Sequence, residues 1–192
     1  MELSITKEVL QQLPLLQFEG RIVVINTSHA LDSVVDELRK HRVVGIDTEA
    51  RPSFRKGEYH PTSLVQISID SKCFLIRLQS TGFTDKLIEY FEDDSFKKIG
   101  IALHDDLIDL KRIKKFKPAG FIDLNKRATA MGMDDIGAKK LSGIFLNGRI
   151  SKTQQTSNWE NKILTPAQKT YAATDAWICL KIYEVMQEEG MV

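Results

Sequence analysis

Short segments rich in β-branched and other apolar residues dominate the first half of the chain and constrain its fold most strongly. Two of these segments are separated only by Asp70, Ser71 and Lys72, which is typical of a β-hairpin. Because helical patterns become frequent only later, the sequence predicts an α/β protein with a mixed β-sheet flanked by helices. We expect strands at residues 21–27, 43–49, 63–69, 73–78, 98–103 and 120–124, and helices at residues 5–13, 28–42, 83–91, 104–115, 125–131, 134–146 and 165–189.

Capping residues mark the starts of two of these helices. Ser28 is the expected N-cap of the helix at residues 28–42. The sequence Thr165-Pro166-Ala167-Gln168 forms a capping box with proline at the first helical position. The last helix is therefore expected to begin at this point.

The length of 192 residues suits a single domain. We expect residues 1–20 to be an N-terminal extension and residues 21–192 to form the functional domain. No apolar run is long enough to span a membrane, and the N-terminus lacks the pattern of a signal peptide. Cys73 and Cys179 have no metal-binding or disulfide spacing, so a cytoplasmic location is expected.

Acidic residues occupy positions where the sequence pattern predicts apolar ones. Asp47 and Glu49 alternate in the strand at residues 43–49, so they share one face of the sheet with Gly45. Both lie where this strand ends, and open α/β sheets commonly bind ligands at that edge. Taken alone, the two acids are equally compatible with a solvated surface.

Two helices also carry an acid on an apolar line. Asp106 lies four residues before Leu110, although an acid here also suits the positive end of a helix dipole. Asp175 follows Tyr171 by four residues. Its structural alternative is an ion pair with a buried lysine or arginine. The apolar lines that contain these two acids continue through Ile113 and through Ile178, Ile182 and Val185, respectively.

The combination of the three acidic segments favours one shared metal site over a separate structural role for each acid. No lysine or arginine shares the predicted lines, and clustered carboxylates repel one another unless cations bind between them. Hard oxygen ligands select Mg²⁺ or Mn²⁺, and a pair of such ions is a common arrangement for phosphodiester cleavage.

These motifs resemble those of the DEDDy-type 3′→5′ exonucleases of the DnaQ-like superfamily. The similarity is strongest to ribonuclease D and to the exonuclease domain of the Werner syndrome protein. It rests on VVGIDTEARP with SLVQIS, on KKIGIALHDDLIDL, and on SNWENKILTPAQKTYAATDAWICLKIY. The last motif is the most specific of them. One departure is that Ala102 to His104 offers no asparagine where relatives often carry Gly-x-Asn.

The resemblance implies a ribonuclease H-like fold and a 3′→5′ exonuclease that releases 5′-nucleoside monophosphates from DNA or RNA with a free 3′ end. It also implies two divalent metal ions, Mg²⁺ or Mn²⁺, as cofactors. The implied metal ligands are Asp47, Glu49, Asp106 and Asp175. Tyr171 is implied to orient the attacking water, a role that suits a phenol with an ordinary pKa near 10. A catalytically weak nucleic-acid-binding module on the same fold is the alternative.

Several further residues are candidates for gripping the substrate. They are the backbone amide of Thr48, the basic side chains of Arg51, Arg55 and Lys56, and Trp159. A core position is the favoured alternative for Trp159. Five basic residues also fall within positions 111–117, where a solvated helix end and a phosphate track are equally compatible with the pattern.

Overall fold

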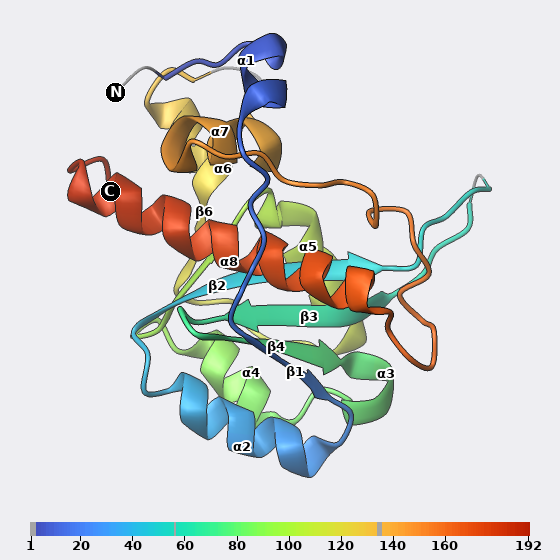
Figure 1. Cartoon of the computed structure of the whole chain (residues 1–192). Coiled ribbons are helices and arrows are strands. Elements are labelled where there is room, and N and C mark those ends of the chain that lie inside the picture. The colour runs from blue at the N-terminus through green and yellow to red at the C-terminus, as the bar shows by residue number, and fades with distance from the viewer. Residues whose placement is uncertain (1–2, 56, 134–135) are drawn as a thin grey trace.

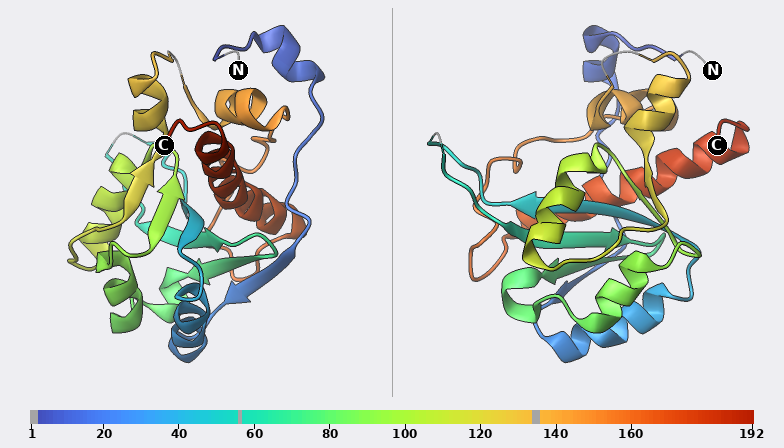
Figure 2. Two further views of the ribbon diagram at one scale, coloured as in Figure 1. Left: turned by 90° about the vertical axis from the view of Figure 1, so that its left-hand side faces the viewer. Right: turned by 180° about the vertical axis from the view of Figure 1, so that it is seen from behind.

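A six-stranded sheet with helices on both faces forms the body of the computed structural model, which describes residues 3–55, 57–133 and 136–192 (Figures 1 and 2). The predicted α/β class with a mixed, helix-flanked sheet is confirmed. The strands are β1 Arg21–Ile25, β2 Val43–Ala50, β3 Thr62–Ser68, β4 Lys72–Arg77, β5 Lys97–Gly100 and β6 Phe121–Asp123. The helices are α1 Lys7–Gln12, α2 Ser28–Leu38, α3 Leu78–Thr81, α4 Asp85–Glu92, α5 Leu103–Ile113, α6 Leu124–Ala130, α7 Ala138–Leu146 and α8 Pro166–Glu188.

The strand order is β1-β4-β3-β2-β5-β6, and β3 runs antiparallel to both of its neighbours. The other adjacent pairs are parallel. The hairpin between β3 and β4 forms as predicted, with the backbone N–H of Ile69 donating to the carbonyl of Lys72 at 2.9 Å. This arrangement places β2 near the middle of the sheet, where it is paired on both edges.

Each face of the sheet has its own core. The core on one face joins α2, α4 and α5 to the strands, and it includes Leu31, Leu38, Val44, Ile46, Phe91 and Leu110. On the other face, α8 crosses the sheet (Figure 1), and α6 and α7 pack beside it. The capping box at Thr165 forms as predicted, with its side chain accepting from Gln168 N and the Gln168 side chain returning to the Thr165 backbone.

Some local expectations were wrong. The N-cap of α2 is Thr27 rather than Ser28, because the Thr27 hydroxyl accepts from the backbone N–H of Ala30. The helix expected at residues 134–146 begins at Ala138 among the described residues, and positions 134 and 135 lie outside them. The apolar line of α5 leaves the core early, since Ile113 is 38% exposed.

The N-terminal segment packs against the α7 side of the molecule. Arg149 donates its backbone N–H to Pro14 O, and Leu16 donates to Arg149 O, which fixes the connector that follows α1. An added Cβ on Gly143 in α7 would lie 2.6 Å from a methyl carbon of Leu10, so α1 lies directly on that helix. In the described part of the chain, no helix combines the length and apolarity needed to cross a membrane.

Candidate active site

The close contact between β2 and α8 brings the acids of these two elements together. A Cβ at Gly45 would lie 1.9 Å from the carbonyl oxygen of Ala176, so only glycine fits at this crossing. Small residues line the facing side of α8, where Ala172 and Ala176 are fully buried. As a result, the end of β2 that carries Asp47 and the middle of α8 are held side by side.

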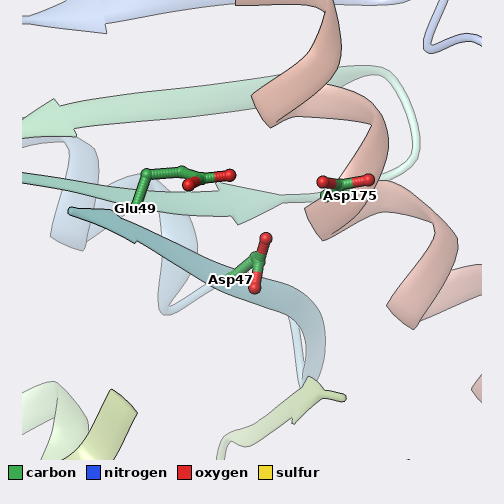
Figure 3. A group of neighbouring side chains, drawn as sticks. All are labelled: Asp47, Glu49 and Asp175. Carbon is green, nitrogen blue, oxygen red and sulfur yellow. The ribbon is translucent and has the colours of Figure 1, made fainter. Parts of the chain in front are cut away.

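Three of the candidate metal ligands converge at this contact. One carboxylate oxygen each from Asp47, Glu49 and Asp175 lies within 4.8 Å of the other two. Figure 3 shows the two β2 side chains directed toward the same space as Asp175 on α8. All three residues are partly buried. Oxygen ligands at this spacing suit a hard divalent cation.

Asp106 approaches the same end of β2 from α5, but it does not belong to that close group. The hydroxyl of Thr48, which lies between the two acids of β2, donates to Asp106 Oδ1 at 2.6 Å. Asp105, the neighbouring acid, is exposed. The structure therefore arranges the four predicted carboxylates as three in close contact and one linked to them through Thr48.

The turn that leads into α5 fixes the position of Asp106. Ala102 caps this helix in the left-handed region, with φ 58°, which is costly for a residue with a side chain. The carboxylate of Asp123 accepts hydrogen bonds from the backbone N–H groups of Ala102 and Leu103, at 3.0 and 3.1 Å. This anchor compensates for the strained turn and holds the first turn of α5 beside β2.

Burial is the main reason why the pKa of every one of these acids is raised. The pKa of Asp47 is raised well above its usual value by burial and then by the charges of Asp175 and Asp106. Burial, followed by the charges of Asp47, Asp175 and Asp106, raises the pKa of Glu49 to about 10. The pKa of Asp106 is raised to about 6, although its hydrogen bond to Thr48 opposes the shift.

Two groups stabilise the ionised form of Asp175. Burial raises the pKa of Asp175 to about 7, while a hydrogen bond from Tyr171 and the positive charge of Lys152 act in the opposite direction. Burial and the nearby acids raise the pKa of Tyr171 itself, so its phenol stays protonated at neutral pH. Tyr171 and Asp175 also line a cavity of about 250 Å³, together with Ser151 and Thr153.

The donor set fits a divalent cation. Clustered carboxylates with raised pKa values are what a cation site presents before the ion binds, because the ion supplies the missing positive charge. Gln66 adds a second observation, since it pairs across the strands with Asp47 and is fully buried. Neither its amide oxygen nor its nitrogen has a hydrogen-bond partner among the residues that the structure describes.

Sequence reasoning did not assign a role to Gln66 or Lys152. Gln66 interrupts an otherwise apolar run within β3, and a polar residue in a buried strand is a readable signal. Lys152 lies in the irregular segment before α8, and no periodic pattern predicts that its charge reaches Asp175.

The predicted substrate contacts occupy different environments. The side chain of Thr48 is engaged with Asp106. Arg51 is exposed but forms an ion pair with Glu160 at 3.4 Å, and Arg55 is exposed. Trp159 is only 1% exposed and packs against Tyr171 with the ring centroids 6.0 Å apart, as its core alternative predicts. Lys56 lies outside the described residues.

The carboxylate cluster should make the metal-free protein less stable as the pH rises. A raised pKa means that the folded protein holds the proton more tightly than the unfolded chain, whose Asp pKa is about 3.9. Stability should therefore fall from about pH 4 through the pKa of Asp106, about 6, and that of Asp175, about 7. We expect a loss on the order of 2 kcal/mol, or about 4–8 °C in Tm, between pH 5 and pH 8.

Thermal melting in a chelating buffer measures this loss, and Mn²⁺ or Mg²⁺ should reverse it at pH 8. Asp175→Asn should flatten the pH dependence, because it removes one titrating member of the cluster. The matched control Asp105→Asn changes an exposed acid and should melt with the wild-type pH dependence. A metal-free protein whose Tm rises steadily to pH 8 would contradict the raised pKa values of these acids.

Known proteins are similar to this chain over most of its length. The family model described as 3′-5′ exonuclease matches residues 22–190. The mouse bifunctional 3′-5′ exonuclease/ATP-dependent helicase WRN is 31% identical over 97% of the chain, and the Drosophila melanogaster exonuclease 3′-5′ domain-containing protein 2 is 34% identical over 86%. The chain spans only 14% and 30% of the lengths of these two relatives.

A solved structure confirms the fold. Trypanosoma brucei RNase D, in a complex with RNA U12, superposes with a TM-score of 0.79 at 19% identity, covering 96% of this chain and 66% of that one. The expected ribonuclease H-like architecture is thus shown by shape as well as by sequence. Because the family model extends over nearly the whole sequence and its match includes all four candidate carboxylates, the chain belongs to the 3′-5′ exonuclease family.

Proposed function

We propose that this chain hydrolyses the phosphodiester bond at the 3′ end of a DNA or RNA strand and releases 5′-nucleoside monophosphates. The convergence of Asp47, Glu49 and Asp175 within 4.8 Å, in a member of the 3′-5′ exonuclease family, carries the proposal. These three residues and Asp106 are the proposed ligands of two divalent ions, Mg²⁺ or Mn²⁺. Such ions, when bound, supply Lewis-acid stabilisation of the phosphate and lower the pKa of water.

The side chains of the chain itself are proposed to position the reactants. Tyr171 is a protonated phenol, so it donates a hydrogen bond to the attacking water or a phosphate oxygen rather than removing a proton. Thr48 holds Asp106 in place through its 2.6 Å hydrogen bond. The cavity of about 250 Å³ beside Tyr171 and Asp175 is the proposed place for the terminal nucleotide.

The grip on the substrate is proposed to combine the loop after β2 with the irregular segment before α8. Arg51 and Arg55 stay candidates for phosphate contacts, and Arg51 must exchange its ion pair with Glu160 to make one. Trp159 is proposed to support the site from the core by packing on Tyr171. Both cysteines, Cys73 and Cys179, are free and buried, which supports the proposed cytoplasmic setting.

The proposed substrate includes both RNA and DNA. The structural neighbour from Trypanosoma brucei holds RNA, whereas the name of the mouse relative, an exonuclease and helicase, does not specify the nucleic acid. The test uses matched single-stranded RNA and DNA oligonucleotides, each labelled at either the 3′ or the 5′ end. A 3′→5′ exonuclease releases a labelled mononucleotide from the 3′ label at once, whereas the 5′ label yields a ladder of shortening products.

Cleavage should require Mg²⁺ or Mn²⁺ and stop when EDTA is added, because the clustered acids cannot hold a phosphate without cations. Restoring the metal after EDTA treatment is the control for damage to the protein. Full cleavage in a chelated, metal-free sample would overturn the proposed function. Internal fragments from both labels at the earliest times would instead indicate an endonuclease.

A further inference from the structure

A basic groove lies next to the acidic site, between α1 and the start of α7, two elements that Figure 1 shows on the same side of the molecule as α8. It encloses about 710 Å³. The cationic side chains that line it are Lys7, Lys139, Lys140, Arg149 and Lys152. They come from three separate parts of the sequence, so the fold rather than a local charge run assembles this surface.

Side-chain packing and hydrogen bonds hold the wall of the groove in place. Leu10 of α1 and Ile5, which precedes that helix, pack on α7, because a Cβ at Gly143 would meet their methyl carbons at 2.6 and 3.0 Å. Arg149 ties the connector after α1 by three hydrogen bonds, two through its backbone and one from Nε to the Leu13 carbonyl at 3.0 Å. The Arg149 charge is therefore held at a fixed place on the rim.

The groove is continuous with the candidate active site through the segment that contains Lys152. Lys152 lines the groove, while its neighbours Ser151 and Thr153 line the cavity that Tyr171 and Asp175 share. The positive charge of Lys152 also acts on Asp175. A strand whose 3′ end occupies the cavity has only this short segment to cross before it reaches the groove.

Four of the cations that line the groove are available to a ligand. Lys7, Lys139, Arg149 and Lys152 are exposed, and among the described residues none of them forms an ion pair with a carboxylate. Elsewhere on the surface, cations such as Lys114 and Lys86 do have acidic partners. These four unpaired charges beside four acids are the arrangement that a polyanion needs, because the acids alone would repel it.

We propose that this groove binds the sugar-phosphate backbone of the single strand on the 5′ side of the nucleotide that is cleaved. The inference rests on the proposed exonuclease function and adds to it the path of the substrate and a role for the N-terminal segment. A nucleic acid fits better than an acidic peptide, because the groove leads directly to the site at which a phosphate must lie.

The test compares two double variants that each remove two exposed lysines. Lys7→Ala/Lys139→Ala changes the groove, and Lys115→Ala/Lys117→Ala changes the basic stretch after α5, which packs on the opposite face of the sheet. Binding of a trinucleotide and a dodecanucleotide is measured by fluorescence anisotropy in Ca²⁺ over a range of salt concentrations. This readout does not depend on turnover.

The groove variant should bind the dodecanucleotide about tenfold more weakly, and it should lose most of the advantage of the long strand over the trinucleotide. The slope of log K against log salt should fall by about 1.4, which is about 0.7 for each lost phosphate contact to a single strand. Lys7→Arg/Lys139→Arg should restore both quantities, because charge rather than shape is responsible. The Lys115/Lys117 variant should behave as the wild type.

An unchanged salt slope in the groove variant, or a loss confined to the Lys115/Lys117 variant, would overturn the proposal. Binding of polyglutamate is measured in parallel as a model of an acidic peptide. If the groove mutations weaken the binding of polyglutamate but not of the oligonucleotides, the groove binds a peptide and the proposal is wrong. Failure of the proposed function looks different. In that case the wild-type protein cleaves neither oligonucleotide in Mg²⁺ or Mn²⁺, whatever its binding in Ca²⁺.

Discussion

Asp47→Asn should lower the single-turnover cleavage rate of a 3′-labelled oligonucleotide by at least about 10²–10³-fold, the usual effect of removing one preorganised electrostatic group. Asp47 lies at the centre of the acidic site, and its pKa is raised by burial and by the charges of Asp175 and Asp106. The loss should be accompanied by unchanged or higher thermal stability of the metal-free protein, because one of several mutually repelling charges is gone.

The same combination is expected for Glu49→Gln, Asp106→Asn and Asp175→Asn. Opposite changes in activity and stability distinguish a functional carboxylate from a structural one, since a structural acid would lose both together. The adjacent pair on α5 provides the matched control: Asp105 is exposed, whereas Asp106 accepts the 2.6 Å hydrogen bond of Thr48. Asp105→Asn should cleave at the wild-type rate.

A wild-type rate for Asp106→Asn with a large loss for Asp105→Asn would show that the second motif has been assigned to the wrong residue. Thr48→Val provides an intermediate case. It keeps the shape of the side chain but removes the hydroxyl that holds Asp106, so the rate should fall while substrate binding in Ca²⁺ stays the same. Equal rates for Thr48→Val and the wild type would mean that Asp106 needs no such support.

The parts of the site that follow from local sequence could be predicted. Alternation along a strand places Asp47 and Glu49 on one face, and a spacing of four residues places Tyr171 and Asp175 on one side of a helix. The capping box at Thr165 likewise sets the start of α8 through contacts within four residues. These rules act over short distances, so they hold whatever the rest of the chain does.

The tertiary packing that brings the predicted acids together could not be derived from local sequence patterns. Only the crossing at Gly45 and Ala176 decides that the acids of β2 meet Asp175, and nothing local in either segment specifies that approach. Lys152 reaches the site from an irregular segment, which has no periodicity to read. The strand order is a third example, because β1 pairs with β4 through contacts between residues about 50 positions apart.

The residue that caps a helix also could not be predicted reliably from this one sequence. Thr27 and Ser28 are both good N-cap residues, and the chain uses Thr27 because its hydroxyl reaches the backbone N–H of Ala30. The strained cap at Ala102 carries no sequence signal at all, since alanine is a poor choice for the left-handed region. Its explanation lies in Asp123, which is 21 residues away and supplies both hydrogen bonds.

Tyr171→Phe should reduce the single-turnover rate by about 10²-fold, the lower end of what a positioning or acid-base group contributes. Phenylalanine keeps the ring and therefore its packing on Trp159, but it deletes the hydroxyl that interacts with Asp175. The raised pKa of Tyr171 excludes a role as a free base near neutral pH, so the lost contribution is that of an oriented hydrogen-bond donor.

This origin predicts a particular pattern of results. The rate should fall at every pH between about 6 and 9, because no titrating base is removed. Binding of the oligonucleotide in Ca²⁺ and the melting temperature should stay close to wild type. Trp159→Phe is the structural comparison: it disturbs a 1% exposed side chain behind the same tyrosine, so stability should fall first. A Tyr171→Phe protein that melts early but cleaves at the wild-type rate per folded molecule would show that the hydroxyl serves packing alone.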